Sequence, residues 1–196
     1  MKNVLLLLFV IAACWTLMEG DKPVQLGPGV MVTDIPKQVI IQNAEYFDFK
    51  GYQITPLAEF VIKAKILSKN NYRLGRESDL SPMDLALGWK SMSDETVINN
   101  IVINQSGRWY RWQVQDFPIP RRDIETQSAN MHLIPANNAV ESMMKQVSQG
   151  EIIEIRGYLV RVDAQDGWHW QSSLTRDDTG AHACELIFVE SLHLSE

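Results

Sequence analysis

The sequence predicts a β-dominated α+β domain, built on a twisted antiparallel sheet or a partly open barrel with two or three short helices. Apolar and polar residues alternate along residues 57–67, and β-branched residues fill residues 152–162. Helix caps and helical spacing occur only in short stretches of the chain. A chain of 196 residues with 45% hydrophobic composition can bury one good core, so we expect a single β-rich domain over residues 38–196.

Residues 1–18 form a targeting or anchoring segment, for which three interpretations stay open. Lys2 precedes an apolar run that continues to Met18, as in an uncleaved N-terminal anchor helix. Ile11-Ala12-Ala13-Cys14 has the form of a bacterial lipoprotein cleavage site, in which Cys14 would carry the lipid. The third interpretation is a cleaved signal peptide. All three place the domain outside the cytoplasm.

Residues 19–37 are rich in glycine and proline without periodicity, which predicts a flexible tether. A long strand is then expected over residues 57–67. Side chains such as Phe60 and Lys63 point to opposite sides of it, so the strand has one buried face and one wet face. The polar residues that follow, up to Asp79, predict a loop.

Three short helices are indicated by their ends. Ser81-Pro82 fits an N-cap and a first helical position, and Ser93-Asp94-Glu95 places carboxylates at the positive end of a helix dipole. The third helix begins at Asn137 or Asn138 and ends at Gly150. Its apolar residues recur at helical spacing, at Val140, Met143, Met144 and Val147.

Two further patterns predict antiparallel strands. Residues 101–114 read as a hairpin around Gln105-Ser106-Gly107-Arg108. Residues 152–174 turn at Asp166-Gly167, a type I′ signal, and residues 184–189 supply a third strand, which completes a β-meander. A meander that follows a capping helix is typical of an OB-like barrel, although this fold analogy transfers no function.

Composition and motifs exclude several classes of function. The net charge of −6 disfavours nucleic-acid binding, which needs a positive field. Of the two cysteines only Cys184 lies in the domain, so the domain forms no internal disulfide. The sequence holds no phosphate-binding glycine loop, nucleophile elbow, His-Glu-x-x-His or Cys-x-x-Cys motif. We therefore expect no cofactor and favour a protein that is not an enzyme.

Cysteine and histidine supply the weak catalytic candidates. His182 and Cys184 share one face of a strand, where an imidazole could activate the thiol, and His132 or His169 could act as a more distant base. The four histidines, His193 included, lack the short spacing of zinc ligands, so no metal is expected.

The binding candidates are aromatic and basic residues that interleave. They are Trp109, Tyr110, Arg111, Trp112, Trp168 and Trp170. Alternation places Trp109 and Arg111 on one face of a strand and Tyr110 and Trp112 on the other, so one set can be exposed for stacking on a ligand. Residues 118–135 are rich in directional polar side chains and read as a groove-lining loop or as an internally satisfied connection.

Three segments carry a resemblance to known proteins. Residues 128–135, residues 166–180 and Ala183-Cys184-Glu185 resemble a group of uncharacterised bacterial membrane-anchored proteins. The resemblance covers most of the domain and implies a bacterial envelope setting, without roles for individual residues. We therefore expect a membrane-anchored, extracytoplasmic interaction module for an envelope protein or glycan. A hydrolase or thiol enzyme that uses Cys184 and a histidine, and a structural subunit of an envelope complex, are the alternatives.

Overall fold

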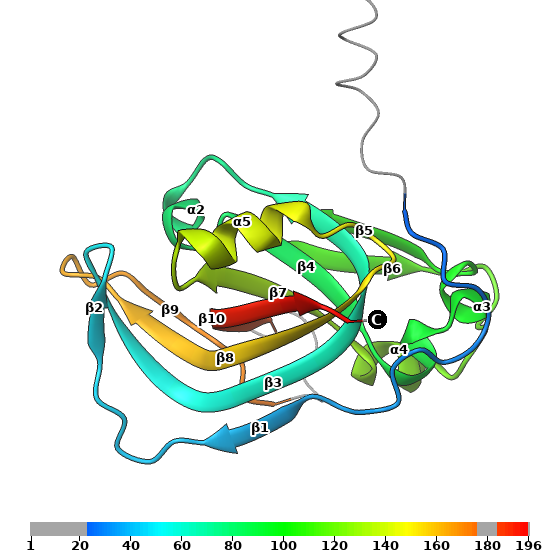
Figure 1. Cartoon of the computed structure of the whole chain (residues 1–196), viewed down its shortest axis with the longest axis horizontal. Coiled ribbons are helices and arrows are strands. Elements are labelled where there is room, and N and C mark those ends of the chain that lie inside the picture. The colour runs from blue at the N-terminus through cyan, green and yellow to red at the C-terminus, as the bar shows by residue number, and fades with distance from the viewer. Residues whose placement is uncertain (1–22, 176–183, 196) are drawn as a thin grey trace, which may run out of the picture.

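The computed structural model describes residues 23–175 and 184–195, and these residues form a β-dominated α+β fold with a twisted mixed sheet and a few short helices (Figure 1). The expected anchor over residues 1–18, its Cys14, and His182 lie outside the described residues. Within the described ranges, no helix combines the length and hydropathy needed to cross a membrane.

Ten strands make up most of the regular structure in the described ranges. They are β1 (Lys37–Ile40), β2 (Phe47–Phe49), β3 (Tyr52–Asn71), β4 (Met83–Gly88), β5 (Val102–Ser106), β6 (Trp109–Gln113), β7 (Ser128–Pro135), β8 (Ile152–Asp163), β9 (His169–Gln171) and β10 (Glu185–Leu194). The helices are α2 (Arg76–Leu80), the 3₁₀ helix η1 (Lys90–Ser93), α3 (Glu95–Ile98), α4 (Arg121–Thr126) and α5 (Asn138–Gln146). All of them are short, and α5 is the longest of those described.

Five strands close into a ring in the order β3, β4, β7, β10 and β8, because β8 also pairs with β3. The long β3 makes this possible by pairing with β8 over residues 53–65 and with β4 over residues 65–71, with a register shift in each ladder. The strand bends where its partner changes, since a bulge increases local twist.

One pairing departs from the expected antiparallel sheet. The β7 and β10 strands are parallel, and all other pairs in the ring are antiparallel. The chain leaves β7 through α5, runs along β8, and returns as β10 between β8 and β7. A strand antiparallel to β8 in that position must run in the same direction as β7, so the sheet is mixed.

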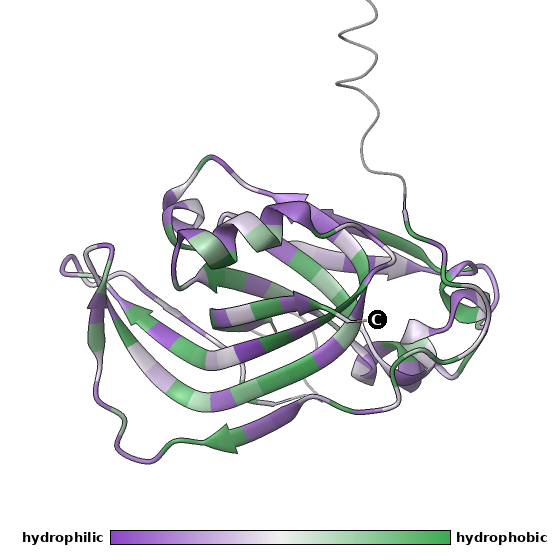
Figure 2. Ribbon diagram, in the orientation of Figure 1, coloured by the Kyte–Doolittle hydropathy of each residue, from purple (hydrophilic) through white to green (hydrophobic). Residues whose placement is uncertain are grey.

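The inner core receives apolar side chains from all five strands of the ring. It includes Phe60, Ile62, Leu85, Leu133, Ile155 and Ile187. The predicted buried face of β3 is confirmed, because Phe60, Ile62, Ala64 and Ile66 are all buried, and Figure 2 shows hydrophobic and hydrophilic residues alternating along the strand. The expected wet face is wrong at Lys65, which is 1% exposed and donates to the buried carboxylate of Glu95. The α5 helix adds Val140 and Met144 to the same core, and its predicted cap is confirmed by hydrogen bonds from two backbone N–H groups to Asn137.

The opposite face of the sheet carries two smaller apolar clusters. The first, which we call the Phe188 cluster, contains Ile54, Leu80, Ile134, Val160, Val162, Leu186 and Phe188. The second, the hairpin cluster, contains Leu67, Ala86, Met92, Ile101 and Ile124, and it is covered in part by Tyr110 and Trp112 of the β5–β6 hairpin. The strip of sheet between these two clusters carries the polar residues of the candidate site.

Several predicted helix starts and loops are wrong in detail. Ser81-Pro82 leads into β4 rather than a helix, and α2 lies in the predicted loop before it. The cap of α3 is Asp94 rather than Ser93, because the Asp94 carboxylate accepts the N–H of Thr96. Residues 118–135 form α4 and β7, a buried strand, instead of a loop. Sequence rules missed β7 because it is buried on both faces and therefore lacks alternation.

The C-terminal strands do not form the predicted meander. The β9 and β10 strands each pair with β8 but not with each other, and they follow one another along the same edge of β8. The turn at Asp166-Gly167 does reverse the chain, but only Gly167 has a positive φ, of 89°. A type I′ turn needs a positive φ at both central residues, so that turn type is wrong.

Part of the expected tether is held against the domain. The N–H of Val24 donates to the carbonyl of Gln149, the N–H groups of Leu26 and Gly27 donate to the carboxylate of Glu95, and Val32 lies in the inner core. We call residues 24–32 the strap. The strap is therefore part of the folded domain rather than a flexible tether.

Candidate functional site

A two-lobed cleft lies on the outer face of the sheet, between the β5–β6 hairpin and residues 169–175. Lobe one has a volume of about 810 Å³ and lobe two of about 620 Å³. Trp109 and Cys184 line both lobes, so they mark the junction between them. A concave site of this size, lined by aromatic and polar groups, is typical of ligand binding.

The β6 strand supplies the aromatic wall of lobe one. Its burial alternates as predicted: Trp109 and Arg111 are exposed, with 42% of Trp109 accessible, and Tyr110 and Trp112 are half-buried on the hairpin cluster. The Tyr110 hydroxyl lies 3.0 Å from the Ser128 hydroxyl, and burial raises the pKa of Tyr110 to about 12. Tyr110 therefore anchors the hairpin and leaves Trp109 free to face the cleft.

The remaining predicted binding residues divide between the cleft and its surroundings. Trp170 lines lobe two, where its ring packs 4.9 Å from the His132 ring. Trp168 lines neither lobe; it packs on Tyr52, and the Arg76 guanidinium lies 4.7 Å from its ring centre. The structure therefore brings five of the six predicted residues to the cleft and assigns Trp168 to packing.

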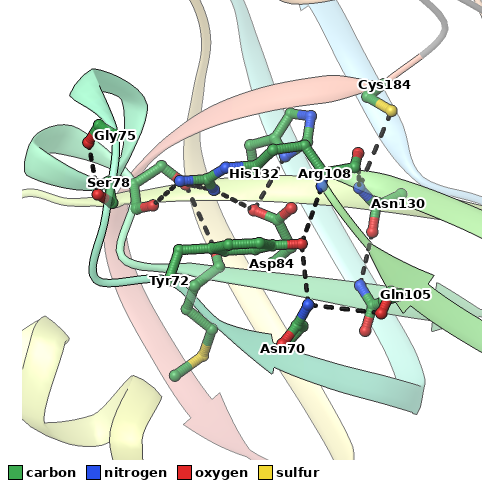
Figure 3. A network of polar contacts seen from close by, with 12 residues as sticks. Asn70, Tyr72, Gly75, Ser78, Asp84, Gln105, Arg108, Asn130, His132 and Cys184 are labelled. Carbon is green, nitrogen blue, oxygen red and sulfur yellow. Dashed lines mark hydrogen bonds and ion pairs between the residues drawn. The ribbon is translucent and has the colours of Figure 1, made fainter.

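A buried polar centre forms one end of lobe two, and it joins three side chains (Figure 3). Arg108 Nη1 donates to Oδ1 of Asp84 at 2.7 Å, and Nδ1 of His132 lies 2.9 Å from the same oxygen. The Asp84 side chain is fully buried, and His132 is 4% exposed. Asp84 and His132 are neighbours because they pair directly across β4 and β7.

The β5–β6 turn positions Arg108 for this centre. Gly107 and Arg108 both have positive φ values, 58° and 69°, as the two central residues of a type I′ hairpin turn require. The guanidinium lies 3.9 Å from the ring centre of Tyr72 and also donates to the Ser81 carbonyl and hydroxyl. These contacts fix the cation above Asp84.

The hydrogen bonding of this centre is incomplete. The His132 Nδ1 and Asp84 Oδ1 atoms are close, but the N–H is not aligned with the oxygen, so Nδ1 has no hydrogen-bond partner. The second carboxylate oxygen of Asp84, Oδ2, also has none. Unsatisfied buried polar atoms are rare and costly in folded proteins, and they concentrate at functional sites.

The thiol of Cys184 is half-buried at the junction of the lobes. Its Sγ lies 3.9 Å from the amide nitrogen of Asn130. His132 and the exposed His169 line lobe two with it, whereas His193 lines neither lobe. In the described part of the chain, no three acidic, histidine or cysteine side chains gather as metal ligands.

Sequence analysis missed Asp84 and Tyr72. The signal for Asp84 was present, because it is the one charged residue in the apolar strand Met83–Gly88. Only the pairing of β4 with β7 and the fold of the hairpin bring it to His132 and Arg108. No protein family model, curated protein or solved structure matches this chain.

Proposed function

We propose that the domain is an OB-like barrel that binds an oligosaccharide of the bacterial envelope in the two-lobed cleft. The order of the ring supports the fold assignment. Counted along the chain, its five strands are β3, β4, β7, β8 and β10. The first pairs with the second and the fourth, and the third pairs in parallel with the fifth, as in an OB fold. The α5 helix lies between the third and fourth strands of that ring. OB folds bind oligonucleotides and oligosaccharides on the face of their second and third strands.

The position of the cleft agrees with that analogy. The second and third ring strands are β4 and β7, and β7 supplies Ser128, Asn130 and His132 to the cleft lining. Of the two ligand classes, a net charge of −6 disfavours nucleic acid. An oligosaccharide needs aromatic faces for its rings and polar groups for its hydroxyls, and the cleft offers both. The resemblance to membrane-anchored proteins and the apolar N-terminal segment support the envelope location.

The observation that carries the proposal is the exposure of Trp109 at the junction of the lobes. Trp109 is 42% accessible, and the Arg111 guanidinium lies 6.0 Å from its ring centre. An exposed tryptophan in a polar cleft is a frequent binding hot spot, since it offers a large rigid surface. Stacking of a sugar ring on Trp109 would place the chain of sugars across both lobes.

A glycan array probed with the full chain in mild detergent tests the proposal. We expect binding to a subset of bacterial glycans, and we expect Trp109→Ala to weaken it by about tenfold or more. Trp168→Ala is the matched control, because Trp168 lines neither lobe and should retain binding. Absence of binding to every glycan, or equal loss in both variants, would refute the proposal.

A thiol-dependent hydrolase is the second candidate. It is favoured by the place of Cys184, which lines lobe two together with His132, whose Nδ1 approaches Asp84. Such an enzyme would lose ester hydrolysis in Cys184→Ser and would react with iodoacetamide faster than a free thiol near pH 7. Turnover that persists in Cys184→Ser would remove this candidate.

A further inference from the structure

We infer that lobe two is a subsite for an acidic group of the ligand, a carboxylate or a phosphate on the sugar, held by Arg108 and His132. The inference rests on the proposed function and adds the chemical class of the glycan. It starts from a difference in composition between the two lobes. Lobe one is lined by two arginines and by the carboxylates of Glu125 and Glu185. Among the described residues, lobe two is lined by Arg108, His132 and His169 and by no carboxylate.

Arg108 keeps donors for a ligand. A guanidinium has five N–H donors, and the described structure uses three, on Asp84 Oδ1, the Ser81 hydroxyl and the Ser81 carbonyl. The side chain is 19% exposed and lines lobe two. The remaining donors therefore suit the paired oxygens of a carboxylate or phosphate.

His132 supplies the second contact. Its Nδ1 side faces Asp84, and Nε2 makes no hydrogen bond to any residue in the described ranges. The imidazole is 4% exposed and lines lobe two, so a ligand in the lobe can reach the ring edge that Asp84 does not occupy. The free Nε2 edge can therefore contact an acidic group in the lobe, next to the donors of Arg108.

The charged groups that face His132 come from two elements. From β4, Asp84 faces the imidazole, and the hairpin turn adds Arg108, whose charge balances that carboxylate. Tyr72 is neutral, with a pKa raised above 10.0 by burial and then by Asp84, and the remaining titratable groups of the lobe are His169 and Cys184. Arg108 therefore balances Asp84, and among the described residues no carboxylate lines lobe two to repel an acidic group.

Matched glycan pairs on the array test the chemistry of the ligand. The pairs are uronic-acid oligosaccharides with their methyl esters, and phosphorylated sugars with their unphosphorylated forms. We expect the acidic member to bind about tenfold tighter or more, which corresponds to about 1.4 kcal/mol. Preference for the uronic acids identifies a carboxylate ligand, and preference for the phosphorylated sugars a phosphate ligand.

Calorimetry with the best acidic glycan and its neutral partner tests the residues. Arg108→Gln and His132→Leu should each weaken binding of the acidic member by about tenfold or more and leave binding of the neutral member unchanged. His193→Gln is the matched control, since His193 is exposed outside the cleft and should behave as wild type.

The failures of the two proposals are distinguishable. Binding to neutral and acidic glycans alike, or an unchanged preference for the acidic member in both Arg108→Gln and His132→Leu, would overturn the acidic subsite and leave glycan binding intact. Absence of any glycan binding would overturn the proposed function itself. A thermal unfolding curve of each variant separates loss of the site from loss of the fold.

Discussion

Two clusters of charged residues are buried in this domain, and they differ in how completely their atoms are paired. One joins Lys65 to Glu95 beneath the strap, and the other joins Arg108, Asp84 and His132 beside lobe two. Both are removed from water, and both contain a cation and a carboxylate 2.7 Å apart. Burial therefore does not distinguish them.

The Lys65–Glu95 cluster is satisfied. Lys65 is 1% exposed and donates to Oε1 of Glu95, which also accepts the N–H of Leu26, and Oε2 accepts the N–H of Gly27. All the contacts lie within the protein and hold the strap to β3 and α3. A buried ion pair with this geometry serves the structure, because every charge has partners.

The Asp84 cluster leaves atoms unpaired. Oδ2 of Asp84 and Nδ1 of His132 have no hydrogen-bond partner, and the cluster borders a cleft. Satisfied buried charges thus act as a structural clasp, whereas unsatisfied charges beside a cavity are typical of a binding site. Three predictions test this distinction.

Removal of Glu95 should have the largest effect on stability. Glu95→Ala leaves the Lys65 ammonium buried without its carboxylate, and we expect a loss of about 3–5 kcal/mol in the free energy of unfolding. Lys65→Met should cost less, since the Glu95 carboxylate keeps its two backbone donors. Urea denaturation measures both losses. Glu141→Ala is the control, because Glu141 is half-buried and pairs with the exposed Lys145 within one helix. A larger loss in Lys65→Met than in Glu95→Ala would contradict the assignment of the strap contacts.

Acid should release the strap and lower the stability of the domain, by an amount between the effects of removing Glu95 and of removing His132. The hydrogen bond from Lys65, followed by that from Leu26, lowers the pKa of Glu95 below 4.5. A carboxylate with a lowered folded pKa adds stability above its unfolded pKa and loses it as pH falls through the folded pKa. The unfolding midpoint should therefore hold from pH 7 to about pH 5 and fall below about pH 4.5. Glu95→Gln should lose part of this acid dependence, and an unchanged profile in that variant would argue against the clasp.

Removal of His132 should have the smallest effect on stability. His132→Leu replaces an imidazole with an unpaired nitrogen by an apolar group, so the free energy of unfolding should change by no more than about 1 kcal/mol. Chemical denaturation measures this change. A loss well above about 2 kcal/mol would show that His132 serves the fold, and the contrast between the two clusters would disappear.

The sequence predicted elements best where local periodicity is strong. The buried face of β3, the hairpin around Gly107-Arg108 and the Asn137 cap are all confirmed, because each depends on neighbours in the chain. The β7 strand was missed because burial on both faces removes the alternating pattern. The strap was missed because its order comes from Glu95, which is far from it in sequence.

The candidate site was predicted in part. The β6 aromatics and Trp170 were selected because aromatic and basic residues interleave around them, and five of the six predicted residues line the cleft. Trp168 has the same local pattern but packs on Tyr52. The sequence of a strand shows which side chains share a face, but it does not show which face is covered by another segment of the chain.

The sequence alone determined the β-dominated class, the long β3 strand and the aromatic side chains available for binding, since these follow from residue type and local spacing. Tertiary structure decided the parallel pairing of β7 with β10 and the meeting of Asp84, Arg108 and His132. These three residues lie on β4, at the β5–β6 turn and on β7, and only the closure of the ring and the docking of the hairpin bring them within hydrogen-bonding distance. Long-range pairing depends on the free energy of the whole core, and no local pattern records it.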